Sequence, residues 1–405
     1  MLRERVRRLR AVPPAELLLI AVLAGLALAV RAVGRHEYTP DMRIFAVWYA
    51  KLQAAGGLRG LGEPIGNYNA PVLYLLALLT YVPGPLVIKA KAMWLVFDAL
   101  LVLFTYRIVA LRHPGWRVPL LAAFVMAFLP TVVINSSFYG QCDAIWGAFG
   151  LGGVYYLLRG RPWWGVSLCA VALACKPQAI FLFPLLGLLA LAGRLPWRTL
   201  LAVPAVLVVL DLPAMLLGRD PVDLLTLYSP ARQAPWVSAL TSSAASVYAF
   251  LPVTTRLPAV RALGDVFAAA VVTGVCWILV ATRARLDAAR IVTAAAFFAM
   301  VVPWLLPGMH ERYFYLADVL TVVLAFLRPR LWFVPLLVQV ASLPSYLPFL
   351  FFDTRHGPFV DLKVLAAFMF AALLITGHAL LADVRAAPPL TIPAQRRNTE
   401  ELVDA

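Results

Sequence analysis

The sequence consists of long apolar runs separated by short clusters of arginine and lysine. A helix that crosses a bilayer needs about 20 consecutive apolar residues, and many of these runs are that long. Of all residues 62% are hydrophobic and only 14% are charged, whereas ordinary soluble domains carry about 25% charged residues. The short alternating segments of a transmembrane β-barrel are not seen. The sequence therefore predicts an all-α polytopic membrane protein.

The formal charge of +15 could suggest a nucleic-acid partner. The basic residues instead follow the apolar runs in short clusters, as cytoplasmic loops do under the positive-inside rule. We therefore expect membrane lipids, and no nucleic acid, as partners. The basic segment 3–10 precedes a first apolar run that lacks a clear cleavage site, which predicts a retained helix. The composition, rich in Ala, Leu and Arg with few Lys, is typical of a bacterial protein. We therefore expect a multi-pass protein of the cell inner (plasma) membrane, with both termini cytoplasmic and the active site facing outside.

About 12 transmembrane helices are expected, together with two interfacial helices in the first outer loop, 34–87. The predicted spans are 16–33, 88–110, 118–134, 142–158, 163–175, 178–193, 199–217, 265–282, 290–306, 314–327, 331–350 and 359–382. The two outer pieces are 41–55, with apolar residues at helical spacing, and 71–82, which is short for a span. If 71–82 crossed the membrane, the later arginine-rich turns would face outside, against the positive-inside rule.

The first polar segment of interest is Arg35-His36-Glu37-Tyr38-Thr39-Pro40-Asp41-Met42-Arg43. Asp41 could be a solvated loop acid or a helix N-cap, because an amphipathic run follows it directly. It could also be a general base that accepts the proton of an attacking hydroxyl. Arg43 is a candidate substrate-binding residue in the same segment.

A second segment, Tyr139-Gly140-Gln141-Cys142-Asp143, stands at a predicted helix start on the outer side. Turn and N-cap chemistry would account for Asp143, but less well for Gln141. Tyr139, Gln141 and Asp143 are therefore candidate substrate-binding residues.

Lys176 lies between two apolar runs, beside a proline. A lysine at membrane depth is costly, which makes it a functional candidate, although its side chain could also extend to the interface. Its expected role is to bind a lipid phosphate as a point charge.

His310, Glu311 and Arg312 follow one another at the mouth of a predicted helix, just before Tyr313. An outer-rim salt-bridge cluster is one interpretation. The other is that Arg312 clamps a phosphate bidentately with help from His310, while Glu311 and Tyr313 bind substrate. The zinc-protease motif is excluded because its second histidine is missing.

Several further residues bear on the site. Tyr68 and Asn69 precede the short helix 71–82, so their polar groups could line the same cavity. Asp98 and Asp211 lie inside predicted helices, and Asp98 is expected to be structural, either paired or N-cap-like. The four cysteines show no metal-ligand spacing and fall mostly in apolar runs, which indicates packing residues. No metal and no cofactor is expected.

In their order and spacing these segments resemble the GT-C glycosyltransferases, polytopic enzymes that use polyprenyl-phosphate sugars, and in particular the mannosyltransferases related to the GPI and lipomannan pathways. The matching segments are Asp41-x-x-x-Phe45-x-x-Trp48, Asn67-Tyr68-Asn69-Ala70-Pro71, Phe138-Tyr139-Gly140-Gln141-Cys142-Asp143, Ala174-Cys175-Lys176-Pro177-Gln178 and Met309-His310-Glu311-Arg312-Tyr313. The sequence departs from the family at Ala70, where a second proline is usual, and at Tyr139, where tryptophan is usual.

The resemblance implies a conserved catalytic module, 1–217, comprising the first seven spans and the outer loop 34–87. An outer loop with interfacial helices, 218–264, a C-terminal helix bundle, 265–384, and a cytoplasmic tail, 385–405, would follow. It also implies an inverting, metal-independent transfer on the non-cytoplasmic face, with a hexose, most often mannose, moving from a polyprenyl phosphate to a lipid-linked or glycan acceptor.

Two other functions fit the same residues. A transporter or flippase of a lipid-linked substrate would place its ionisable residues at mid-depth, with access from both faces. A ligase or polymerase of surface polysaccharide would use a diphosphate-linked donor and have a larger, more basic outer groove. The candidates here gather at one predicted face, which favours the transferase.

Overall fold

The computed structural model describes residues 13–229, 232, 239–251, 258–350 and 359–382. The basic segment 3–10 and the predicted tail 385–405 lie outside the described residues. Within the described part the fold is helical, and its two strands, β1 (Thr241–Ser242) and β2 (Met309–His310), form one short parallel pair.

The helices vary widely in length. In chain order they are α2 (Pro14–Val33), α3 (Pro40–Ala54), α4 (Ala70–Leu78), α5 (Leu86–Val109), α6 (Arg117–Ala127), α7 (Pro130–Val133), α8 (Asp143–Leu158), α9 (Pro162–Cys175), α10 (Phe183–Leu191), α11 (Ala202–Leu216), α12 (Pro221–Thr226), α14 (Pro258–Ala281), α15 (Ala288–Leu305), α16 (Tyr315–Leu327), α17 (Val334–Leu350) and α18 (Leu362–Ala382). Short turns of 3-10 helix connect several of them, including η5 (Pro177–Leu182) and η9 (Pro329–Leu331), and η4 (Ile134–Tyr139) is a π-helix.

Among the described residues, six helices are long and apolar enough to cross a membrane, and a bent pair would make a seventh. The predicted all-α multi-pass membrane fold is therefore confirmed. The number of about 12 spans stays a prediction, because α8, α9 and α16 have only 16, 14 and 13 residues.

Three predicted spans have different bounds. The run 118–134 is broken between α6 and α7, and its two parts meet at an angle of 51°. The cause is Pro130, since a proline disfavours helical geometry in the residue before it, and Leu129 is indeed extended. The run 178–193 begins as 3-10 helix η5. The helix predicted at 265–282 begins at Pro258, so the end of the predicted loop 218–264 is helical.

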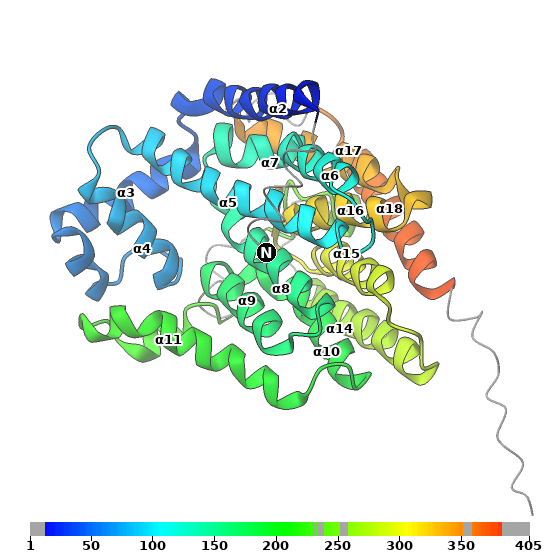
Figure 1. The fold of residues 1–405 in the computed structure, drawn as a ribbon. Helices are drawn as coiled ribbons and strands as arrows, with labels where there is room; N and C mark the ends of the chain where they lie inside the picture. The colour runs from blue at the N-terminus through cyan, green and yellow to red at the C-terminus, as the bar shows by residue number, and fades with distance from the viewer. Residues whose placement is uncertain (1–12, 230–231, 233–238, 252–257, 351–358, 383–405) are drawn as a thin grey trace, which may run out of the picture.

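Both helices predicted in the first outer loop are present as α3 and α4. Figure 1 shows them together at one end of the bundle, with α15–α18 grouped away from them. The 12 residues of the apolar helix Ala70–Tyr81 are about 20 Å long, too short for a hydrocarbon core of about 30 Å. This length is consistent with an interfacial position for 71–82, which stays a prediction.

The core lies where α5, α8, α9, α15 and α16 pack together. Asp98 of α5 forms an ion pair with Arg31 of α2 at 2.8 Å and accepts a hydrogen bond from Ser136 at 2.7 Å. It is therefore structural and paired, as expected. All four cysteines are free and buried.

Candidate active site

Five segments, far apart in sequence, meet where helices begin or break. They are the loop residue Tyr68, the first turn of α3 with Asp41, the segment Tyr139–Asp143 between η4 and α8, Lys176 between α9 and η5, and His310–Arg312 between β2 and α16. Helix ends carry backbone groups without partners inside the helix. The fold therefore brings the polar clusters that the sequence analysis singled out into contact with one another.

Asp41 is not the cap of its helix. Thr39 takes that role, because its hydroxyl accepts a hydrogen bond from the amide of Met42. The Oδ2 of Asp41 accepts a hydrogen bond from the side-chain amide of Gln141 and lies 3.4 Å from the guanidinium of Arg312. The carboxylate is 16% exposed. Among described residues both partners meet Oδ2, so Oδ1 is the oxygen left for another donor.

Gln141 joins Asp41 to Lys176. Its Oε1 accepts hydrogen bonds from Lys176 Nζ at 2.9 Å and from the amide of Cys142 at 3.1 Å. Because the carbonyl side of the amide is fixed in this way, its Nε2–H group must point at Asp41. Gln141 is thus an orienting group for the Asp41 carboxylate.

Lys176 is 1% exposed, and its Nζ lies 2.5 Å from Oδ1 of Asp143. The same ammonium lies 5.1 Å from the ring centroid of Tyr68. Asp143 stands at the first position of α8 and also accepts hydrogen bonds from Asn135 at 2.7 Å and Trp146 at 2.9 Å. The N-cap interpretation of Asp143 is therefore wrong, because its carboxylate is used by tertiary partners and the cap position is Cys142.

Arg312 links three carboxylates. Its guanidinium lies 2.7 Å from Glu311, 3.4 Å from Asp41 and 3.6 Å from Asp143. It is 11% exposed, and within the described part of the chain its buried Nε has no hydrogen-bond partner. Arg312 is therefore a cation with donor capacity left for an anion.

Glu311 is fully buried and holds the other side of Arg312. It accepts hydrogen bonds from Tyr139 at 3.0 Å and Arg312 at 2.7 Å, and Nδ1 of His310 lies 3.5 Å away. Burial raises the pKa of Glu311, but Arg312 and His310 outweigh it and lower that pKa from 4.5 to about 2. Glu311 is thus a permanent anion that positions Arg312.

Aromatic rings enclose the charged groups. Tyr68 packs edge-on against Trp48 and Phe45, at centroid distances of 5.1 and 6.0 Å. Burial raises the pKa of Tyr68 to about 12, so its hydroxyl stays protonated. Tyr313 lies beside His310, at 5.3 Å between ring centroids, and its ring centroid is 5.9 Å from the Arg312 guanidinium carbon.

The segment that carries Gln141 is fixed by α3 and α5. Thr39 donates a hydrogen bond to the carbonyl of Tyr139 at 2.5 Å, and Trp94 donates one to the carbonyl of Gly140 at 3.1 Å. Lys91 donates to three carbonyls, those of Gly34, Glu37 and Phe138, at 2.8, 2.7 and 3.2 Å. These bonds tie the first outer loop to the segment before α8.

The described residues of the predicted loop 218–264 contact the His310 segment. Thr241 and Ser242 pair with Met309 and His310, and the amide of Gly308 donates to the carbonyl of Leu240 at 2.6 Å. The loop therefore adds a wall to the site, beside the histidine.

Asn69 forms its hydrogen bonds with residues outside the charged cluster. Asn69 caps α4, donates to Asp211 at 3.2 Å, and its amide donates to the hydroxyl of Tyr228 at 3.0 Å. Arg43 is exposed on α3. Their expected contacts with substrate remain predictions.

Sequence reasoning missed two residues that touch the cluster. Asn135 binds Asp143, and Tyr346 of α17 lies 3.5 Å from Asn135 and edge-on to Tyr139, with ring centroids 5.9 Å apart. Asn135 had a signal, since it is a polar residue at the end of an apolar run. Tyr346, between Pro344 and Pro348 in an apolar helix, had none.

No protein-family model and no curated protein matches the sequence. Among solved structures, ArnT from Cupriavidus metallidurans, determined with undecaprenyl phosphate bound, matches over 91% of this chain and 77% of its own. The TM-score is 0.55 and the sequence identity is 15%. The two chains share a fold. At this identity the likeness concerns the fold, so the chemistry has to be argued from the residues above.

Proposed function

We propose that the protein is an inverting glycosyltransferase that moves a hexose from a polyprenyl phosphate to a lipid-linked or glycan acceptor on the non-cytoplasmic face. The hexose that we propose is mannose. The observation that carries the proposal is the convergence of one partly exposed carboxylate, Asp41, with the cations Arg312 and Lys176. The ligand in the ArnT structure, undecaprenyl phosphate, belongs to the same class as the proposed carrier.

The proposed reaction is a single displacement at the anomeric carbon. The acceptor oxygen forms a bond to that carbon as the bond to the phosphate oxygen breaks, and the electron pair leaves with the phosphate. Asp41 takes the acceptor proton through Oδ1. A phosphate leaving group needs no protonating acid, so one carboxylate suffices, unlike the paired acids of glycosidases. Attack from the side opposite the leaving group inverts the anomeric centre.

Arg312 is the proposed contact of the departing phosphate. Glu311 and Asp41 hold the terminal nitrogens of its guanidinium, and Nε faces Oδ2 of Asp143 at 3.6 Å without a hydrogen bond, so the donors of Arg312 are not all used. His310, 28% exposed, is the more accessible neighbour and adds a second donor. Cations fixed in a dry site stabilise charge that develops in the transition state, and removing one such donor elsewhere costs about 2.7–4 kcal/mol.

Lys176 acts in this proposal at longer range. Its Nζ is taken up by Asp143 and Gln141 and is almost fully buried. Its charge favours a nearby phosphate, and its hydrogen bond fixes Gln141 and hence Asp41. Gln141, Asp143, Tyr139 and Glu311 are likewise proposed to hold this geometry, while Tyr68 and Tyr313 provide ring faces for the sugar or the acceptor.

The test is sugar transfer by the purified full chain in detergent. Radiolabelled polyprenyl-phosphate mannose and a membrane-lipid extract are supplied to the wild type, to Asp41→Asn, and to Glu37→Gln, a control that removes an exposed carboxylate of the same loop. Transfer by the wild type and the control, but not by Asp41→Asn, supports the proposal.

Two results would count against it. If several polyprenyl-phosphate sugars fail to bind, the glycosyltransferase is wrong and a transporter or flippase becomes the better account. If Asp41→Asn transfers sugar at the normal rate, the class survives and the assigned base does not.

A further inference from the structure

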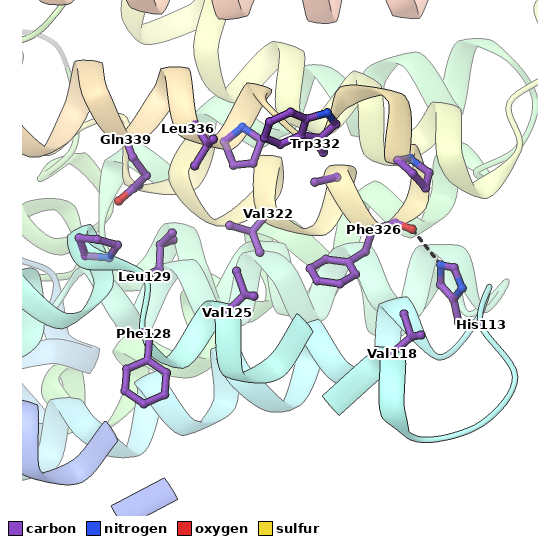
Figure 2. Close-up of a pocket in the computed structure, with 14 residues that line it drawn as sticks. His113, Val118, Val125, Phe128, Leu129, Val322, Phe326, Trp332, Leu336 and Gln339 are labelled. Carbon is purple, nitrogen blue, oxygen red and sulfur yellow. Dashed lines mark hydrogen bonds between the residues drawn. The ribbon is translucent and has the colours of Figure 1, made fainter. Parts of the chain in front are cut away.

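A groove of about 680 Å³ lies between α6 on one side and α16, η9 and α17 on the other. Figure 2 shows Val125 of α6 and Phe128, the residue directly after α6, along one wall, and Val322, Phe326 and Leu336 along the other. Its lining is apolar apart from Gln339 at one end and His113 at the other. Such a surface suits a hydrocarbon chain and excludes a polar ligand.

The groove opens toward the surroundings of the bundle. Val118, Trp332 and Leu336 line it and are exposed. In a membrane-spanning protein, exposed apolar side chains of this kind face lipid chains. From Val118 to Ala127 the α6 side measures about 14 Å at 1.5 Å per residue, which is about half of a 30 Å hydrocarbon core. The groove therefore matches an acyl chain of one leaflet.

One end of the groove is basic. Three of the residues that line this end are each next to an arginine in the sequence: His113 follows Arg112, Val118 follows Arg117, and Pro329 precedes Arg330. All three arginines are exposed, and Arg117 pairs with Glu16 at 2.5 Å. No acidic residue lines the groove. Basic pockets between transmembrane helices bind anionic lipid headgroups.

His113 is held in one orientation by the main chain of α16. Its Nε2 lies 2.9 Å from the carbonyl oxygen of Phe326 (Figure 2), and a carbonyl can only accept, so Nε2 carries the proton. Nδ1 of the neutral ring is then an acceptor, which can take a hydrogen bond from a hydroxyl of a headgroup.

A polar layer separates the groove from the candidate active site. Asp318 accepts hydrogen bonds from Gln339 at 2.8 Å and Ser342 at 3.0 Å, and Gln339 also donates to Thr131 at 2.9 Å. Along α16 this layer lies between Arg312 and the groove, about 6 Å from Val322 at 1.5 Å per residue. A carrier chain that followed α16 from Arg312 into the groove would have to pass the buried Asp318.

We propose that this groove is a binding site for an anionic phospholipid. One acyl chain lies along α6 and α16, and the headgroup phosphate lies at the basic end, against Arg112 and Arg330, with a headgroup hydroxyl toward His113. The site is distinct from the one proposed for the polyprenyl phosphate.

The test uses the full chain in phosphatidylcholine vesicles that contain a trace of phosphatidylglycerol with a diazirine in its acyl chain. After irradiation, the labelled residues are mapped by peptide mass spectrometry. Labelling should concentrate on α6, α16 and α17, and unlabelled phosphatidylglycerol should compete while phosphatidylcholine does not. In the variant Arg112→Gln/Arg330→Gln, labelling should fall by about 5-fold for each arginine removed.

The matched control is Arg159→Gln/Arg161→Gln, which removes two exposed arginines from the turn between α8 and α9 and should label like the wild type. A second variant, Ala325→Phe, fills the groove without changing the charge of the protein. It should abolish labelling in the groove. Equal labelling of α2 and α14, or equal competition by phosphatidylcholine, would overturn the proposal. Displacement of the probe by a polyprenyl phosphate would overturn it too, and would assign the groove to the donor.

Discussion

Charged side chains buried in a membrane-embedded chain are costly unless each has a partner. In the site, Lys176 is paired with Asp143 and Arg312 with Glu311, and both of these carboxylates are 3% exposed or less. Asp41, by contrast, is 16% exposed and has one oxygen without a partner among the described residues. At the scale of residues this difference separates the proposed base from the carboxylates that hold the site together.

Glu311 provides a pH prediction. Its pKa is lowered in the folded state to about 2, so its contribution to stability is present above about pH 4.5 and is lost as the pH falls toward 2. Glu311 is therefore ionised at every pH at which the protein works. We expect Glu311→Gln to lower the transfer rate by up to about 100-fold through misplacement of Arg312. The shape of the pH–rate profile between about pH 5 and pH 9 should not change; a profile whose midpoint moves would show that Glu311 titrates in catalysis.

The pair of Lys176 and Asp143 provides a stability prediction. Lys176→Met leaves a buried carboxylate without its cation, and breaking such a pair costs about 3–5 kcal/mol. Thermal unfolding in detergent should show a large decrease in the melting temperature of this variant. The double variant Lys176→Met/Asp143→Leu should recover part of it, because no charge is then left alone. If the single variant unfolds like the wild type, the pair is not buried as described.

The sequence allowed the residues that meet in the candidate site to be predicted, but not their pairing. Asp41, Gln141, Lys176 and Arg312 stood out because polar groups are rare in a membrane-embedded chain. That Gln141 would bridge Asp41 and Lys176 depends on how α3, α8 and α9 pack, which no local pattern records. For the same reason Tyr346 was missed.

At the scale of elements, apolar runs predicted the existence of helices well. The pieces 41–55 and 163–175 correspond to α3 (Pro40–Ala54) and α9 (Pro162–Cys175). Breaks inside runs were missed, as at Pro130, although proline is a visible signal. The break at Pro130 matters because the segment that follows it, α7 and η4, ends at Tyr139, two residues before Gln141.

Gly140 makes the turn between η4 and α8. Its φ is +76°, and a Cβ there would lie 2.6 Å from the Met42 side chain and 3.0 Å from Lys91. Gly140→Ala should therefore lose more than the roughly 1–2 kcal/mol of a left-handed alanine, and activity should fall. Gly160 is the control, because its φ is +64° and no atom lies within 4 Å of the added Cβ. Gly160→Ala should lose only the roughly 1–2 kcal/mol of stability of a left-handed alanine and should keep its activity. Equal losses of stability in both variants would argue against the close contact of position 140 with Met42 and Lys91.

At the scale of the whole molecule, α3 and α4 lie at one end of the bundle (Figure 1), and the candidate site lies where the first turn of α3 meets Gln141 and Arg312. The turns at Arg159, Arg194 and Arg330 are those that the positive-inside rule predicts to be cytoplasmic. The division of the chain into a catalytic module and a C-terminal bundle stays a prediction.

Thiol labelling tests the predicted sidedness. The four native cysteines are buried, so they form a silent background. In intact cells an impermeant maleimide should label Glu63→Cys, and should label Arg159→Cys and Arg330→Cys only after permeabilisation. The reverse pattern would place the candidate site on the cytoplasmic face, and labelling of all three variants in intact cells would show that the turns do not lie on opposite sides.

The most direct test of the central claim separates donor binding from chemistry in Asp41→Asn. Labelled polyprenyl-phosphate mannose is bound first, acceptor is then added, and transfer is followed over a single turnover. The account predicts donor affinity close to that of the wild type and a transfer rate lower by about 100-fold or more, since general base catalysis contributes about 10²–10⁴-fold. A normal rate of transfer in this variant would contradict the account, because the acceptor proton would then leave by another route.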